Sequence, residues 1–119
     1  EPMLNRKEKG RLGEDLAADF LRERGFQVVV RNFHCPLGEI DLIARRGDLV
    51  VFAEVKSRNT AVYGGPLYAI NERKKRTIRL IASQYLAARP ALNVRSITFR
   101  FDMIAVYGGA VEWIEDILR

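Results

Sequence analysis

Two acidic residues and one lysine interrupt apolar segments near the middle of the chain. Asp41 lies in the segment Gly-Glu-Ile-Asp-Leu-Ile, and Glu54 follows thirteen residues later, two positions before Lys56. Because side chains of a β-strand alternate between its faces, Glu54 and Lys56 share one face if their segment is a strand. Two carboxylates that converge on one face repel each other unless a cation lies between them. The pattern therefore favours a divalent metal ion with oxygen ligands, either Mg²⁺ or Mn²⁺.

Such a site would hydrolyse a phosphodiester bond, because a bound divalent cation polarises the phosphoryl group and lowers the pKa of a water molecule. Lys56 would position or deprotonate that water, or neutralise the charge of the transition state. The competing interpretation is that both carboxylates face solvent and that Glu54 and Lys56 form a solvated pair. The apolar residues around Glu54 favour a central strand instead, where an unpaired charge is costly.

The turn between the two segments decides whether the carboxylates meet. We expect a hairpin of strands at 38–44 and 49–57, with a turn at Gly47. A two-residue turn, at either 46–47 or 47–48, puts Asp41 on the face of Glu54, directly opposite or diagonal to it. A three-residue turn would send them to opposite faces. Strict alternation along the first strand predicts one face with Glu39, Asp41 and Ile43 and the other with Ile40 and Leu42.

The remaining patterns predict the elements that position this hairpin. We expect helices at about 5–24 and 71–88, with Asn5 and Asn71 as their N-caps, and further strands at 26–32, 96–106 and 110–114. The apolar positions of the second helix are Ile78, Ile81, Ala82, Tyr85 and Leu86. The order α-β-β-β-α-β(-β) indicates an α/β fold, a mixed sheet of four or five strands with flanking helices. In the first helix Glu14 lies at the margin of an apolar stripe, and Gly13 lies where another segment can approach closely. That stripe consists of Leu12, Leu16, Ala17, Phe20 and Leu21.

Length and composition narrow the class of protein. The chain has 119 residues, of which 48% are hydrophobic, so we expect a single domain over residues 1–119. The chain has one cysteine, Cys35, so an internal disulfide is excluded. Cys35 is adjacent to His34 in the sequence, and adjacent strand residues are poorly placed to bind one zinc ion. Since no apolar run has the length of a membrane span, we expect a cytoplasmic protein with no membrane partner.

The charge distribution points to a polyanionic partner. Lys and Arg number 20 against 15 Asp and Glu, and the net charge is +5. Clustered cations gain affinity by releasing counterions from a phosphate backbone, so we expect nucleic acid as the partner. The cations between Arg73 and Arg79 have two other interpretations. They are a solvated face of a helix, or they dock on an acidic protein. The candidate phosphate-binding residues are Arg58, Arg73, Lys74, Lys75, Arg76 and Arg79.

These motifs together resemble those of the PD-(D/E)xK nuclease superfamily, and most closely the branch that contains archaeal Holliday-junction resolvases. The wider pattern is similar to the YraN family of uncharacterised, resolvase-like bacterial proteins. The resemblance covers nearly the whole chain. Its residues are Gly13-Glu14, Ala17-Ala18, Gly25-Phe26, Arg31-Asn32-Phe33, Gly38 to Ile43, Phe52 to Arg58, Tyr63-Gly64, Lys74 and Phe101-Asp102.

The resemblance implies a restriction-endonuclease-like core and a role for each matching residue. Asp41, Glu54 and the Val55 carbonyl would bind the metal ion, Glu14 would support it directly or through water, and Lys56 would be the catalytic lysine. Ile40 stands where the superfamily has proline before the aspartate. The implied function is a metal-dependent endonuclease acting on branched DNA. The alternative is a nucleic-acid-binding module that does not cleave. Symmetric cleavage of a four-way junction would require a homodimer.

Two further residues have structural interpretations. Asp102 shares a strand face with Arg100, which predicts an ion pair and no catalytic role. Trp113 is the only tryptophan, and we expect it to pack under the C-terminal segment.

Overall fold

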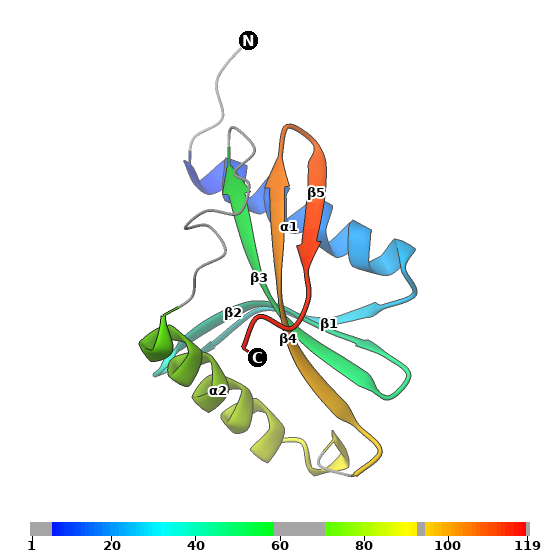
Figure 1. The fold of residues 1–119 in the computed structure, drawn as a ribbon, viewed down its shortest axis with the longest axis vertical. Helices are drawn as coiled ribbons and strands as arrows, with labels where there is room; N and C mark the ends of the chain where they lie inside the picture. The colour runs from blue at the N-terminus through cyan, green and yellow to red at the C-terminus, as the bar shows by residue number, and fades with distance from the viewer. Residues whose placement is uncertain (1–5, 59–70, 93–94, 119) are drawn as a thin grey trace.

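In the part of the chain that the structure describes, two α-helices and five strands follow one another in the predicted order. The computed structural model describes residues 6–58, 71–92 and 95–118. The predicted cap Asn5 and the loop residue Tyr63 lie outside these ranges. The elements, shown in Figure 1, are α1 (Arg6–Glu23), β1 (Gln27–Cys35), β2 (Gly38–Arg46), β3 (Leu49–Arg58), α2 (Glu72–Ala87), the 3₁₀ turn η2 (Pro90–Leu92), β4 (Thr98–Tyr107) and β5 (Ala110–Ile114).

The strands form one mixed sheet in the order β1-β2-β3-β4-β5. β3 and β4 are parallel, and the other neighbouring pairs are antiparallel. A parallel pair needs a long crossover connection, and α2 lies between β3 and β4 in the sequence for this reason. β3 is the central strand, as its apolar sequence predicted, so Glu54 lies in the middle of the sheet.

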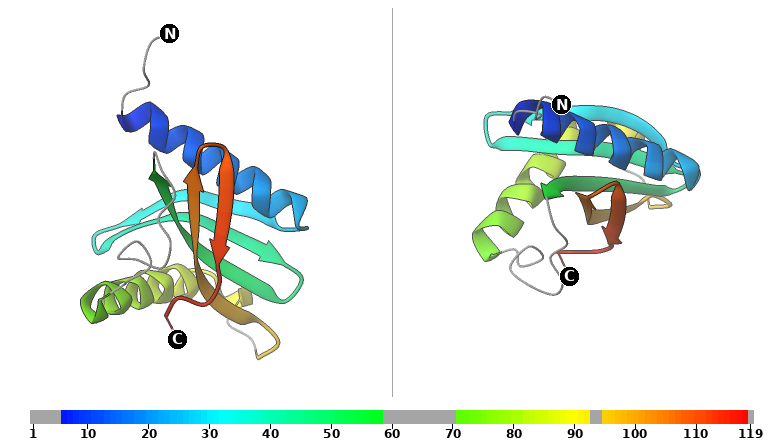
Figure 2. Two further views of the ribbon diagram at one scale, coloured as in Figure 1. Left: turned by 45° about the horizontal axis from the view of Figure 1, so that its top comes forward. Right: turned by 90° about the horizontal axis from the view of Figure 1, so that it is seen from above.

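One helix covers each face of the sheet, as the two views of Figure 2 show. On the α1 face the core contains Val51 and Ala53, and on the α2 face it contains Val50 and Phe52. Successive residues of β3 are thus buried on opposite sides, which is why this strand has an almost continuous apolar sequence. Among the described residues, no helix is both long enough and apolar enough to cross a membrane.

The buried side of α1 differs from the predicted stripe. Leu12 and Leu16 are 48% and 40% exposed, whereas Ala17, Ala18 and Leu21 are fully buried. The difference arises because α1 packs closely against β3 at Gly13. A Cβ atom at this position would collide with the side chain of Ser57. The helix therefore contacts the sheet through its smallest residues, and its two leucines are rotated towards solvent. The prediction of a close approach at Gly13 is confirmed.

This close approach gives the first testable prediction. Alanine at Gly13 should lower the free energy of unfolding by about 1–3 kcal/mol, because Ser57 and β3 must move to accommodate the new methyl group. Alanine at Gly10 should instead raise it by about 0.5–1 kcal/mol, because the same helix has open space there. Urea unfolding of both variants is the measurement. Equal stabilisation by the two substitutions would show that α1 can tilt away from β3 at little cost.

α2 has the predicted cap and the predicted buried face. The Asn71 side chain accepts a 2.7 Å hydrogen bond from the backbone N–H of Lys74, which satisfies a free donor at the start of the helix. Its buried residues, four of the five predicted apolar positions, are Ile78, Ile81, Ala82 and Tyr85.

The C-terminal segment is held by a buried carboxylate. Asp102 on β4 has no exposed surface and forms the predicted ion pair with Arg100, at 2.9 Å. The indole Nε1 of Trp113 and the backbone N–H of Asp116 also donate to this carboxylate. Trp113 also packs edge-on against Phe20 and Phe26 on the α1 face, so the structural role predicted for it is confirmed, with these two rings as its partners.

Candidate functional site at the divergence of two strands

The β2–β3 turn has the length that brings the carboxylates together. Arg46 pairs with Leu49, so the connection is the two-residue turn 47–48, and Gly47 adopts a φ of 58°. The same register continues to Leu42, which pairs with Ala53. Asp41 and Glu54 are the next residues along each strand, just beyond the last paired residues, and the charge of Glu54 acts on Asp41. Of the two turns left open by the sequence, the structure has the one at 47–48.

The predicted alternation along β2 is wrong at Asp41. Ile40 packs in the core beneath α2, but Leu42 packs in the core beneath α1, so the two residues do not share a face. The reason lies in the neighbouring strand. Asn32 of β1 lies opposite Asp41 and has a φ of 55°, a left-handed conformation that interrupts the regular pleat. This conformation also lets β1 continue past its predicted end at 32.

β2 and β3 separate at this point, and the Asp41 carboxylate occupies the gap. Figure 1 shows β2 turning away from β3 beyond the paired segment. The backbone N–H of Val55 donates a 2.8 Å hydrogen bond to Asp41 Oδ2, which replaces the partner that β2 would otherwise supply. A residue in a ladder presents its N–H and its C=O to the same neighbour, so the Val55 carbonyl faces the same gap.

Asp41 is held in an environment that disfavours its ionised form. Burial raises the pKa of Asp41 to about 6, while the hydrogen bond from Val55 opposes the shift. The negative charges of Glu14, Glu54 and Glu39 raise the pKa further. Asp41 forms no ion pair with any Lys or Arg in the part of the chain that the structure describes. The gap thus contains a carboxylate with excess negative charge around it.

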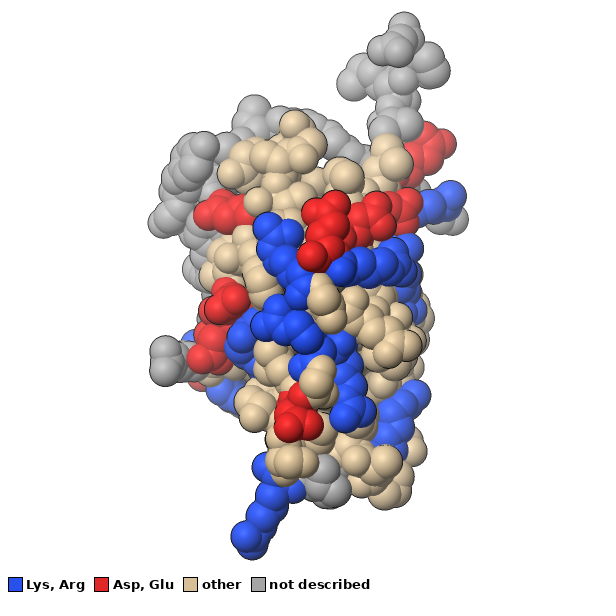
Figure 3. Space-filling model, turned by 90° about the vertical axis from the view of Figure 1, so that its right-hand side faces the viewer, with Lys and Arg blue, Asp and Glu red and all other residues tan. Residues whose placement is uncertain are grey.

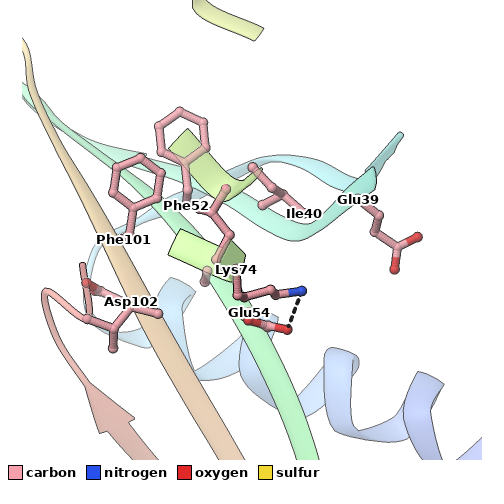
Figure 4. A pocket seen from close by; sticks show the side chains of 10 residues that line it. Glu39, Ile40, Phe52, Glu54, Lys74, Phe101 and Asp102 are labelled. Carbon is pink, nitrogen blue, oxygen red and sulfur yellow. Dashed lines mark ion pairs between the residues drawn. The ribbon is translucent and has the colours of Figure 1, made fainter. Parts of the chain in front are cut away.

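Glu54 lies on the α2 side of the gap and contacts two lysines. Its Oε1 atom is 3.2 Å from Lys56 Nζ and 3.5 Å from Lys74 Nζ. Lys56 comes from the same strand, two residues further on, whereas Lys74 comes from the first turn of α2. Figure 4 shows the Lys74 side chain extending to Glu54 from the helix above the sheet. The sequence identified Lys74 only as a candidate phosphate contact and did not predict this pairing.

A small pocket lies beside the Glu54–Lys74 pair, with a volume of about 20 Å³. Its wall includes the stacked rings of Phe52 and Phe101, whose centroids are 5.2 Å apart. Figure 4 shows these two rings side by side, with Glu39, Glu54 and Lys74 apart from them. The charged groups therefore lie beside an apolar surface, which strengthens electrostatic interactions relative to bulk water.

Glu14 approaches from the other face of the sheet. It belongs to α1 and lies 3.5 Å from Arg31 of β1, which also pairs with Asp15 at 2.8 Å. Its negative charge contributes to the raised pKa of Asp41. Across the described ranges, no three His, Cys, Asp or Glu side chains are close enough together to hold one metal ion. Sequence reasoning missed Arg31 as the partner of Glu14.

The predicted phosphate-binding residues divide into several groups. Arg73 and Arg76 are exposed on α2. Lys75 pairs with Glu72 at 3.4 Å, and Arg79 donates to the Leu118 carbonyl at 2.9 Å, so both have structural contacts. The side chain of Arg58 lies outside the described residues.

Positive charge is not confined to α2. Figure 3 shows basic side chains gathered on the side of the molecule at the right of Figure 1, close to a group of acidic ones. Two arginines outside α2 have structural roles. Arg46 stacks on Phe26 and donates to the carbonyl oxygen of Arg24, which itself stacks on Phe20.

The fold and the site define an α/β protein with two carboxylates and a lysine at a strand divergence. Residues 13–106 match the model of the family described as "Uncharacterised protein family UPF0102". The chain belongs to this family, which is the YraN family that its motifs resemble.

Relatives from several bacteria support the assignment over most of the chain. A UPF0102 protein of Caldicellulosiruptor saccharolyticus is 37% identical over 114 residues, which cover 96% of this chain and 94% of that protein. One from Dictyoglomus thermophilum is 39% identical over 92% of this chain and 94% of its own length. One from Renibacterium salmoninarum is 51% identical over 67% of this chain and 68% of its own length.

Proposed function

We propose that the protein is a metal-dependent endonuclease that hydrolyses phosphodiester bonds in DNA, with branched DNA as its substrate class. One observation carries this proposal: Asp41, Glu54 and Lys56 converge where β2 and β3 separate. A PD-(D/E)xK core is proposed with it. The support is the α-β-β-β-α-β-β order with three antiparallel strands and a parallel β3–β4 pair.

The donor set at the gap fits a hard divalent cation. Asp41 and Glu54 supply carboxylate oxygens, and the Val55 carbonyl faces the same space. Mg²⁺ is usually bound by one or two carboxylates and several waters, so a third carboxylate is not required. The raised pKa of Asp41 supports this fit, because carboxylates arranged to share a cation repel one another in its absence. Glu14 would then act through water or through its charge.

The chain's own residues would orient the reaction. When bound, Mg²⁺ or Mn²⁺ polarises the phosphodiester and lowers the pKa of a water molecule. Lys56 is held beside Glu54, where its ammonium group can hold that water or stabilise the negative charge that develops on the phosphoryl oxygens. Arg73 and Arg76, exposed on α2, would bind phosphates on either side of the scissile bond. Water adds to phosphorus, and the ester oxygen leaves.

Cleavage assays with single-site variants test the proposal. Wild type with Mg²⁺ or Mn²⁺ should cut a four-way junction or flap in preference to duplex, single-stranded DNA or RNA. Alanine at Glu54 or at Lys56 should each reduce the rate by about 10²–10⁴-fold, because each removes a group that contacts the reacting atoms. Glu23→Ala, at an exposed carboxylate at the end of α1, should leave the rate unchanged and is the matched control for loss of a carboxylate. Loss of cleavage in the Glu54 and Lys56 variants, purified in the same way, excludes a contaminating nuclease.

A second function is favoured by one observation. Glu54 is already neutralised by Lys56 and Lys74, and this arrangement suits a nucleic-acid-binding module that does not cleave. In that case junction DNA should bind without a divalent ion, with an affinity that falls steeply as salt rises and survives the Asp41→Asn substitution. Binding of this kind, combined with no cleavage by wild type in either metal, would overturn the endonuclease proposal.

A further inference from the structure

We propose that Lys74 is a second lysine of the reaction centre. In the resting protein its ammonium group pairs with Glu54, and when Glu54 binds a metal ion the same ammonium group moves to contact the substrate phosphate. This inference rests on the proposed function and extends it to a residue of α2. Lys74 Nζ and Lys56 Nζ approach the same oxygen, Oε1 of Glu54, at 3.5 and 3.2 Å. One carboxylate oxygen thus holds two positive charges in the resting protein.

The position of Lys74 is determined by the packing of α2. Its backbone N–H is fixed by the Asn71 cap, and Ile78, one turn further along, is buried against the sheet and lines the same pocket. Residues four apart lie on one side of a helix, so Lys74 is directed towards β3. The neighbouring Lys75 instead pairs with Glu72 within the helix, which shows that position, and not charge alone, distinguishes Lys74.

Metal binding and the two lysines compete for the same oxygen. A divalent ion on Glu54 would repel both ammonium groups, and the pair that is longer and more exposed should break first. Lys74 forms the longer contact, and its side chain is 49% exposed against 36% for Lys56. Because Lys74 stays anchored to the capped end of α2, its ammonium group remains at the pocket opening. There it can contact a phosphate that approaches the metal ion.

The test is substitution of Lys74 by methionine, which keeps the length of the side chain and removes its charge. Calorimetric titration with Mn²⁺ alone should give binding about two- to five-fold tighter than wild type, because a competing charge is lost. Cleavage of junction DNA at saturating Mn²⁺ should nevertheless slow by about ten-fold or more, because a phosphate contact is lost. An ion pair that only anchors α2 would not produce opposite changes in these two quantities.

Methionine at Lys75 is the matched control for metal binding, since it removes one charge from the same turn of α2 without touching Glu54. Its Mn²⁺ affinity should equal that of wild type. If wild type binds Mn²⁺ and alanine at Glu54 abolishes this, unchanged or weaker binding by the Lys74 variant overturns the inference and leaves the proposed function standing. Tighter binding with unchanged cleavage also overturns it. Failure of wild type to bind Mn²⁺ or to cleave overturns both proposals.

Discussion

The substitution Asp41→Asn should make the protein more stable at about pH 8, by about 2 kcal/mol, while it abolishes metal binding. The asparagine side chain keeps an oxygen that can accept the Val55 N–H, and it removes a charge that burial and three neighbouring glutamates disfavour. The pKa of Asp41 is raised from 3.8 to about 6, and a shift of about two units corresponds to about 3 kcal/mol. Burial of the new amide N–H₂ offsets part of this gain.

The sign of the pH dependence follows from the raised pKa. The folded state binds the Asp41 proton more tightly than the unfolded state does, so this group stabilises the fold at low pH. That contribution is complete below the unfolded value of about 3.8 and is lost as the pH rises through about 6. The advantage of the asparagine variant over wild type should therefore be small at about pH 4 and largest above about pH 7.

Urea unfolding of both proteins across this pH range is the measurement. Asp48→Asn is the matched control, because Asp48 is exposed at the hairpin turn, and it should change stability by less than about 0.5 kcal/mol. Saturating Mg²⁺ should stabilise wild type and leave the Asp41 variant unchanged, since a ligand stabilises only the state that binds it. A variant less stable than wild type at about pH 8 would show that Asp41 contributes more to the fold as an ion than its burial costs.

Replacement of Asp102 by alanine should destabilise the protein by about 3–5 kcal/mol. This carboxylate has no exposed surface and accepts hydrogen bonds from Arg100 Nε, Arg100 Nη2, Trp113 Nε1 and the Asp116 N–H, at 2.8–2.9 Å. Its removal leaves a half-buried guanidinium group and two further donors without their acceptor. Since domains of this size have a total stability of about 5–15 kcal/mol, the loss is a large part of the whole.

Two further variants distinguish the contribution of the buried Asp102 carboxylate from that of the more exposed Glu115 carboxylate. Asp102→Asn keeps the shape but presents an amide N–H₂ to donors, so it should cost about 2–3 kcal/mol. Glu115→Gln removes only a 3.6 Å contact between Arg100 and a half-exposed carboxylate, and it should cost less than about 1 kcal/mol. Urea unfolding followed by the fluorescence of Trp113 measures all three. Equal effects of Glu115→Gln and Asp102→Ala would contradict a special role for the buried group.

Local patterns were sufficient for the order of the elements and for several of their contacts. The apolar spacing of α2 predicted Ile78, Ile81, Ala82 and Tyr85 as its buried side, because the period of a helix repeats along the sequence. The Arg100–Asp102 pair followed from alternation along one strand. The two-residue turn at Gly47 was one of the arrangements that the sequence left open. These features depend on residues that are neighbours in the chain.

The geometry of the candidate site depends on contacts between distant segments, and there the sequence was incomplete. Asn32 of β1 breaks the pleat opposite Asp41, so alternation along β2 alone assigned Ile40 and Leu42 to one face. The packing of Gly13 against Ser57 rotated α1 and exposed the leucines that its apolar stripe predicted as buried.

The ion-pair partners of Glu54 and Glu14 were likewise decided by the tertiary structure. Glu54 meets Lys74 because the α2 crossover returns over β3, and Glu14 meets Arg31 because α1 crosses β1. Neither pair has a signal in sequence spacing, since each joins elements whose separation is set only when the helices pack on the sheet. The sequence by itself determined the identity of the central strand and the family, and it supplied the residues proposed for the site. Packing decided which of those residues form contacts. A salt bridge requires two atoms within a few ångströms of each other, and the periodicity of one segment does not predict its distance from a segment elsewhere in the chain.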